Sequence, residues 1–167
     1  MTTTALTAKE FRRALGQFTT GITVMTVERE PGHVFGMTAN SFTSVSLDPM
    51  LVLVCVDQRA KILAMLGKKK RFGISVLKQG QQAISEYFAQ GEQSLEAEQR
   101  LAIRYHWTPG GIPVLEGAIL HLTCNLVDSH IAGDHTVFIG EVETAAVHDG
   151  EPLLFFRGEY RALAGNH

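Results

Sequence analysis

Short hydrophobic segments, separated by polar turns, recur along the chain and predict β-strands. Residues 21–28, 50–57 and 72–77 have strand length and are rich in Val and Ile, which favour strands. Two longer segments, 117–129 and 136–147, flank a Gly-Asp turn. They therefore predict a long antiparallel ribbon.

Further short strands are expected at residues 34–42, 153–156 and 159–163. A Pro-Gly turn precedes the first of these segments, so it is expected to pair antiparallel with residues 21–28. Residues 108–113, which contain two Gly and two Pro, predict a loop.

Helical spacing appears at three places. Thr7 and Glu10 form a capping-box pattern, and Phe11, Leu15 and Phe18 follow on one helical face. This helix is expected to end near residues 19–21, and the Thr-rich segment before it is expected to be flexible. The other helices are residues 59–66, ended by Gly67, and residues 81–89. Residues 94–105 are either helical or an ordered excursion.

About seven strands with hairpin-like connections and three interspersed helices indicate a mainly antiparallel β fold, closed as a barrel. The 167 residues show no repeats or linkers, so residues 1–167 are expected to form a single domain. A net charge of −2 argues against a broad nucleic-acid or membrane surface. No apolar run reaches the roughly 18 residues of a membrane span.

The two cysteines, Cys55 and Cys124, lie in apolar strand-like segments, and no signal peptide precedes them. They are expected to be reduced core residues of a cytoplasmic protein. His121 and Cys124 are three residues apart on a predicted strand, which places them on opposite faces. No zinc motif is present, and we expect no metal site.

Residues 36–49, Gly-Met-Thr-Ala-Asn-Ser-Phe-Thr-Ser-Val-Ser-Leu-Asp-Pro, are dense in small and hydroxyl side chains. They read as a strand that ends in a loop, because Ser, Thr and Asn compete with helix hydrogen bonds. Two interpretations remain open from the residues alone. The stretch is a polar edge strand with a turn, or it is a wall where a flat ligand approaches the main chain.

Other candidate sites are few. There is no Gly-x-Gly-x-x-Gly, P-loop or Gly-x-Ser-x-Gly pattern, so Rossmann, P-loop and serine-hydrolase sites are not expected. The basic run Lys68–Arg71 favours a solvated turn over a phosphate site. His135, after Gly133 and Asp134, is either a turn residue or a ring that lines the mouth of a ligand site.

Taken together, five segments resemble one known family. They are Gly-Ile-Thr-Val (21–24), the 36–49 stretch, Arg-Ala-Lys (59–61), Phe-Gly-Ile-Ser-Val-Leu (72–77) and Gly-Asp-His-x-x-x-x-Gly-x-Val (133–142). Their order and spacing resemble the flavin reductase-like, split-barrel flavin-binding family over about residues 11–163. The strongest likeness is to the small reductase component of two-component flavin-dependent monooxygenases, such as those that act on 4-hydroxyphenylacetate or phenol.

The resemblance implies a homodimer of Greek-key-like antiparallel split β-barrels that bind FMN or FAD near the dimer interface. By this resemblance, Thr38, Ala39, Asn40 and Ser41 contact the flavin ring and ribityl chain, and Cys55, Val56 and Asp57 line the same groove. Arg59, Ala60 and Lys61 lie near the flavin phosphate, and His135 lies beside the nicotinamide. Relatives often carry a Tyr where this chain has Phe155, so Arg157 and Tyr160 are the candidate replacements for that polar contact.

The implied activity is NADH- or NADPH-dependent reduction of flavin, followed by delivery of reduced flavin to a separate monooxygenase. The cofactor carries the hydride chemistry, so the lack of a paired acid and base does not count against this activity. Two alternatives are a flavin-storing module without turnover and an oxidase similar to pyridoxamine-phosphate oxidase. The second would need more basic residues around a substrate phosphate than the chain has outside residues 59–71.

Overall fold

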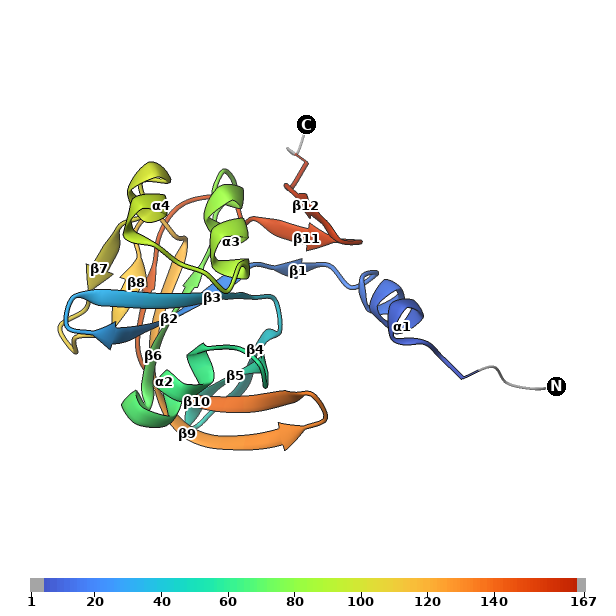
Figure 1. The fold of residues 1–167 in the computed structure, drawn as a ribbon, viewed down its shortest axis with the longest axis horizontal. Helices are drawn as coiled ribbons and strands as arrows, with labels where there is room; N and C mark the ends of the chain where they lie inside the picture. The colour runs from blue at the N-terminus through green and yellow to red at the C-terminus, as the bar shows by residue number, and fades with distance from the viewer. Residues whose placement is uncertain (1–4, 165–167) are drawn as a thin grey trace.

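The computed structural model describes residues 5–164, and most of the Thr-rich start lies outside that range. Its centre is a seven-stranded, wholly antiparallel sheet in the order β3-β2-β6-β9-β10-β5-β4 (Figure 1). The strands are β2 (Thr23–Glu30), β3 (His33–Ala39), β4 (Phe42–Leu47), β5 (Met50–Asp57), β6 (Arg71–Val76), β9 (Leu120–Ala132) and β10 (His135–Val147). The long β9–β10 ribbon confirms the hairpin predicted around the Gly-Asp turn.

The two edge strands of this sheet, β3 and β4, are consecutive in the chain and are joined only by Asn40 and Ser41. The sheet therefore curls until its edges meet. In this link the Ser41 hydroxyl donates to the Cys55 carbonyl (2.9 Å) and accepts from the Cys55 N–H (3.2 Å), which extends the pairing of β4 with β5. The predicted fold class, a mainly antiparallel split barrel with flanking helices, is confirmed.

The 36–49 stretch was expected to be a strand that ends in a loop, and its second half differs from that expectation. Residues 42–47 form β4, which pairs with β5 through a bulge near Val45. Alternating small polar residues fit an exposed edge strand, so the dense hydroxyls did not prevent strand formation.

The barrel interior is apolar, with Met25, Val54, Val56 and Phe72 fully or almost fully buried. The helix α2 (Ile62–Lys69) closes one side of it by burying Ile62 and Leu66. The prediction that Gly67 ends this helix is wrong. Gly67 is exposed and has open space around it, and the helix continues to a left-handed C-cap at Lys70.

A second, smaller core lies above the sheet and includes Leu77, Phe88 and Leu115. The helices α3 (Gln82–Ala89) and α4 (Leu95–Arg100) cover this core (Figure 1). Residues 94–105, for which a helix was one of two expectations, are helical in part. The loop predicted at 108–113 is flanked by two short paired strands, β7 (Tyr105–Trp107) and β8 (Pro113–Leu115). These three-residue strands are too short to produce a recognisable pattern.

The N-terminal helix α1 (Ala8–Leu15) projects from the body of the molecule (Figure 1). Its capping box is confirmed, but it ends at Leu15 and not near residues 19–21. Residues 20–21 instead form β1, which pairs with β11 (Leu154–Phe156), and β11 pairs with β12 (Glu159–Arg161). No residue of α1 is buried. Within residues 5–164, no helix has the length and apolar character needed to cross a membrane.

Candidate functional site

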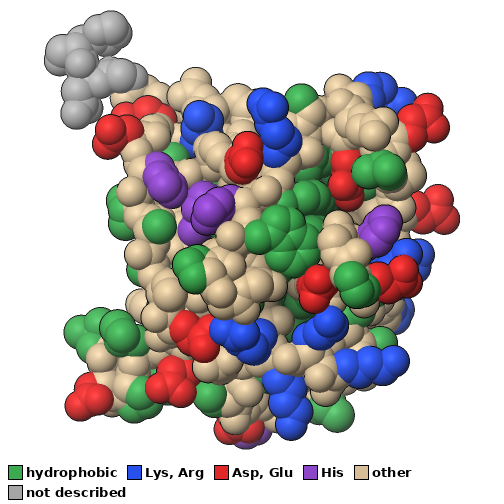
Figure 2. Space-filling model, turned by 90° about the vertical axis from the view of Figure 1, so that its left-hand side faces the viewer, with side chains coloured by type: hydrophobic (Ala, Val, Ile, Leu, Met, Phe, Trp, Pro, Cys, Tyr) green, Lys and Arg blue, Asp and Glu red, His purple; other side chains and the backbone are tan. Residues whose placement is uncertain are grey.

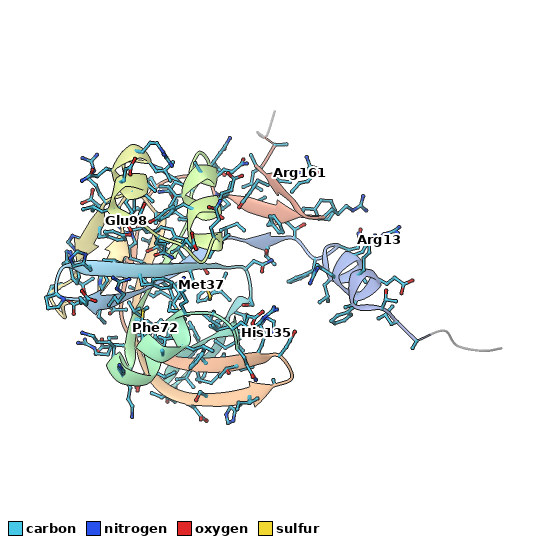
Figure 3. The ribbon with its side chains drawn as sticks, viewed as in Figure 1. Arg13, Met37, Phe72, Glu98, His135 and Arg161 are labelled. Atoms are coloured by element: carbon cyan, nitrogen blue, oxygen red, sulfur yellow. The ribbon has the colours of Figure 1, made fainter. Side chains whose placement is uncertain are left out.

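A groove of about 380 Å³ lies between edge strand β3, the start of α2 and the segment that follows α3. This volume falls in the range of small-molecule sites. We call it the β3 groove, and it is lined by Phe35, Gly36, Met37, Thr38, Asp57, Arg59, Ala60, Lys61, Ile62, Phe88, Ala89, Gln90, Gly91 and Gln93. Figure 3 shows Met37 on β3 facing the side of α2. The structure thus brings together five predicted site residues: Thr38, Asp57, Arg59, Ala60 and Lys61.

The hydroxyls in the 36–49 stretch serve the fold. Thr38 Oγ1 donates to the carbonyl of Ser85 on α3 at 2.6 Å, and the Ser41 hydroxyl binds the main chain of Cys55 on β5. Thr38 therefore both lines the β3 groove and ties its wall to α3. The structural and the ligand-wall interpretations of this stretch are compatible with each other.

Four further predicted residues differ in how they can meet a ligand. Ala39 and Val56 are buried in the barrel core, so only their main chains are available to a ligand. The Ala39 carbonyl already accepts from Thr23 Oγ1 at 2.7 Å. Asn40 is exposed and Cys55 is half-buried. None of these four lines the β3 groove directly, and their flavin contacts remain a prediction.

The turn into α2 is organised by Asp57 and Arg59. The Asp57 carboxylate accepts from the Arg59 N–H (2.8 Å), Nε (3.0 Å) and Nη2 (2.7 Å). These hydrogen bonds from Arg59 lower the pKa of Asp57 well below its usual range. The carboxylate therefore stays ionised and fixes the guanidinium at the edge of the groove.

The start of α2 has the features of an anion site. The N-cap residue is Lys61, there is no side-chain cap, and the first turn has no acidic residue. The helix dipole and the unfilled N–H groups both favour an anion there. Lys61 is exposed and forms no ion pair among residues 5–164, so its ammonium group is available to a phosphate.

His135 begins β10 directly opposite Asp57 in the strand register. Its Nδ1 lies 2.7 Å from Asp134 Oδ1, a contact that lowers the pKa of Asp134. Gln58 secures the turn, because its N–H donates to Asp134 O (3.0 Å) and its Nε2 donates to Gly133 O (3.1 Å). The ring of His135 is thus held in a defined position at the end of the barrel near Asp57 (Figure 3).

Arg157 and Tyr160 do not line the β3 groove. The Arg157 guanidinium donates twice to Gln17 Oε1, at 2.9 and 2.7 Å, just after α1. The Tyr160 hydroxyl lies 2.9 Å from Ser85 Oγ. Ser85 is also the residue whose carbonyl accepts the hydrogen bond from Thr38. Tyr160 supports the groove wall, whereas Arg157 is fixed against the N-terminal segment.

Nine residues that line the β3 groove were not predicted as site residues, among them Gly36, Phe88 and Gln93. The Gln93 side chain donates to Gly36 O (2.6 Å) and accepts from Gly36 N (3.0 Å). A Cβ at Gly36 would lie 2.6 Å from the Phe88 ring, so a close approach of strand and ring requires glycine here. Gly36, the first residue of the 36–49 stretch, was the sequence feature that indicated a close neighbour such as Phe88. No residue near Gln93 in the sequence indicates its contact with Gly36.

A larger hollow, of about 920 Å³, lies between α1 and the β11–β12 turn. Of the predicted site residues only Arg157 lines it, and its wall is a helix with no buried residue. Residues 5–164 contain no group of three or more His, Cys, Asp or Glu side chains placed to hold a metal ion. Cys55 and Cys124 are free thiols, and burial raises the pKa of Cys124 to about 12.

Comparisons with known proteins agree with this site. The model of the flavin reductase like domain matches residues 15–164. An NADH-dependent flavin reductase from Rhodococcus sp is 43% identical over 160 residues, covering 95% of this chain and 88% of that protein. The reductase subunit HsaB of a flavin-dependent monooxygenase from Rhodococcus jostii is 33% identical, covering 95% and 80%.

Among solved structures, the Streptomyces globisporus C-1027 NADH:FAD oxidoreductase SgcE6 is 38% identical with a TM-score of 0.86. The match covers 95% of this chain and 94% of that one. The chain belongs to the flavin reductase like family, and the resemblance seen in the sequence is confirmed.

Proposed function

We propose that this protein reduces FMN or FAD with NADH or NADPH and releases the reduced flavin to a separate monooxygenase. One observation carries the proposal: the β3 groove joins a strand wall at Thr38 to an uncapped, lysine-bearing helix start, with His135 fixed opposite Asp57. The relatives named above, among them an NADH-dependent flavin reductase and a monooxygenase reductase subunit, support the same activity.

The groove residues fit a flavin. Lys61 and the start of α2 supply positive charge for its phosphate. Met37 and Ala60 offer apolar surface, and Thr38 adds strand main chain to the same groove. When bound, the flavin supplies the hydride-accepting chemistry.

The contribution of the chain is orientation. Asp134 holds the His135 ring, and we assign to this ring the placement of the nicotinamide over the flavin site. Asp57 holds Arg59 at the mouth, and Tyr160 and Ser85 brace the wall at Thr38. No general base is required, because a hydride transfer moves no proton from a side chain.

The predicted homodimer is part of this proposal. Its support is the exposed apolar side chains of the N-terminal segment: Phe11 is 53% exposed, Leu15 57% and Phe18 78%. Leu47 and Met50, at the tip of the β4–β5 hairpin, are also exposed, at 90% and 57%. Burial of such groups against a second copy of the chain would stabilise an assembly.

We further propose that residues 1–167 act as one domain in the cytoplasm. The family match from residue 15 to residue 164 supports the first point. The two free cysteines, one of them half-buried, support a reducing compartment.

The experiment that tests the activity is a kinetic matrix of NADH and NADPH against FMN, FAD and riboflavin, with NAD(P)H oxidation as the readout. Flavin-dependent oxidation above the protein-free rate supports a reductase. Flavin binding without any turnover would favour a storage module instead. Oxidation of a bound amine would favour the oxidase alternative.

A further inference from the structure

The turn that precedes His135 lies at the free end of the β9–β10 ribbon. β6 pairs with β9 only from Leu120 to Asn125, so the last residues of β9 have β10 as their single strand partner. In Figure 1 this end of the ribbon projects beyond the other strands of the same sheet. The two turn residues, Gly133 and Asp134, belong to no strand. Their position therefore depends on contacts other than strand pairing.

A single residue supplies those contacts. Within residues 5–164, Gln58 is the only residue outside β9 and β10 that forms hydrogen bonds with Gly133 or Asp134. Its N–H donates to Asp134 O at 3.0 Å, and its Nε2 donates to Gly133 O at 3.1 Å. Gly133 has a φ of 64°, in the left-handed region that favours glycine, so the turn has a defined shape for Gln58 to hold.

The contact between Asp134 and His135 does not by itself place the ring. The two side chains are 87% and 43% exposed, and an exposed pair of this kind contributes little stabilisation. Both residues also belong to the same end of the ribbon, so their contact orients the ring within the turn and not the turn against the barrel. The position of the ring relative to the start of α2 follows from whatever holds the main chain of the turn.

We propose that Gln58 is a positioning residue for the hydride donor: it fixes the Gly133–Asp134 turn, and with it the His135 ring, against the start of α2. This inference rests on the proposed function. Asp57 and Arg59, the chain neighbours of Gln58, organise the turn into α2 at the β3 groove. Gln58 thus joins the phosphate end and the nicotinamide end of the site in one hydrogen-bonded unit.

The exposed Gln58 side chain does not line the β3 groove, so it acts on the donor through His135. Hydride transfer needs the two reacting atoms about 3–3.5 Å apart, and a displaced ring weakens donor binding or slows the transfer. The flavin-binding features at Lys61 and Thr38 do not involve the turn. A loss at Gln58 should therefore change the donor kinetics more than the flavin affinity.

The variant Gln58→Met keeps the length of the side chain and removes the Nε2 donor. The main-chain bond to Asp134 O remains, so the turn still forms and is held by one hydrogen bond in place of two. Gln79→Met is the matched control, because Gln79 is exposed and its side chain makes no hydrogen bond within residues 5–164. The readouts are amide exchange of residues 133–136, the KM for NADH, the anaerobic rate of FMN reduction and the Kd for FMN.

In Gln58→Met we expect amide exchange in the turn to become faster by about threefold to tenfold, the change that loss of one hydrogen bond brings. The KM for NADH should rise, or FMN reduction should slow, by a similar factor, while the Kd for FMN stays within about twofold. Unchanged exchange and kinetics, equal changes in Gln79→Met, or a Kd for FMN that rises as much as the KM for NADH would each overturn the proposal.

A double-mutant cycle tests whether Gln58 acts through the ring. Once His135→Ala has removed the ring, adding Gln58→Met should leave the KM for NADH and the rate of FMN reduction as they are in His135→Ala alone. A residue that merely stabilised the fold would not depend on His135 in this way. If the second substitution causes the same loss with and without the ring, Gln58 does not position His135.

A lysine at position 58 restores a donor, and Gln58→Lys is made together with Lys68→Gln to keep the net charge. Lys68 belongs to the C-terminal end of α2, which lies on the side of the molecule drawn in Figure 2, where several Lys and Arg side chains gather over the lower part. This pair should recover most of the exchange protection and donor kinetics lost in Gln58→Met. Values equal to those of Gln58→Met would contradict the role of the Nε2 donor.

Amide exchange is measured without flavin or donor, so it separates two failures. If the wild type reduces no flavin, the proposed function fails, and the exchange rates still decide whether Gln58 holds the turn. If the wild type reduces flavin and Gln58→Met matches it in exchange and in donor kinetics, the reductase stands and this inference fails.

Discussion

Gln93 binds both main-chain groups of Gly36: its Nε2 lies 2.6 Å from Gly36 O, and its Oε1 lies 3.0 Å from Gly36 N. β3 is an edge strand, so without this amide the two groups would have no strand partner on that side. The segment after α3 is thereby fixed against β3, and both residues line the β3 groove.

We expect Gln93→Ala to lower the free energy of unfolding by about 1–2 kcal/mol, because two partly buried polar groups lose their partner. Urea denaturation measures this change. Gln79→Ala is the control, since Gln79 is exposed and its side chain makes no hydrogen bond within residues 5–164. Equal stability of the two variants would show that the Gln93 pairing does not hold the segment.

Lys61→Gln tests the phosphate end of the β3 groove. Loss of one charge-assisted contact should raise the Kd for FMN about threefold to tenfold, while riboflavin, which has no phosphate, should bind as before. Lys68→Gln, an exposed lysine at the other end of α2, controls for net charge. A parallel loss of FMN and riboflavin affinity would place the phosphate elsewhere.

His135→Ala tests the nicotinamide end. We expect the KM for NADH to rise, or flavin reduction to slow, by a larger factor than the Kd for flavin changes. His130→Ala is a suitable control, because His130 is an exposed histidine of β9 that also lies next to a carboxylate, 2.9 Å from Asp128. If flavin affinity falls while the nicotinamide kinetics stay constant, His135 positions the flavin and not the donor.

His121 gives a prediction for stability against pH. Burial lowers its pKa from 6.5, with smaller contributions from His148 and His106. Its Nε2 donates to Leu115 O at 2.6 Å, which leaves Nδ1 to accept from His148 Nε2 at 3.2 Å. The folded state therefore favours the neutral ring, and the unfolded state binds the proton first on acidification.

The stability that His121 contributes is thus present above about pH 6.5 and is lost as pH falls below it. The fall in Tm between about pH 7.5 and about pH 5.5 should be about 2 °C smaller in His121→Gln than in the wild type. Differential scanning fluorimetry at the two pH values gives the comparison. An identical fall in both proteins would show that His121 does not govern this range.

The strands of the barrel were predictable because each carries its own local signal, such as the β-branched residues of β2 and the apolar run of β5. The role of Thr38 was not predictable in the same way. Its hydroxyl bonds a carbonyl 47 residues away in the sequence, and only the fold brings the two together.

The errors have similar physical causes. The apolar spacing of Phe11, Leu15 and Phe18 predicted a longer helix, but the helix ends at Leu15, and Thr20 and Gly21 pair with β11. Gly67 was taken as a helix end, although a single exposed glycine costs a helix only about 1 kcal/mol. The Gln93–Gly36 contact joins residues 57 apart and leaves no trace in local sequence.

The most direct test of the account is anaerobic mixing of the purified protein and FMN with NADH, followed by the visible absorbance of the flavin. The account predicts rapid bleaching that requires the protein and slows in His135→Ala. Bleaching no faster than in the protein-free mixture, with both FMN and FAD and with both nicotinamide donors, would contradict it.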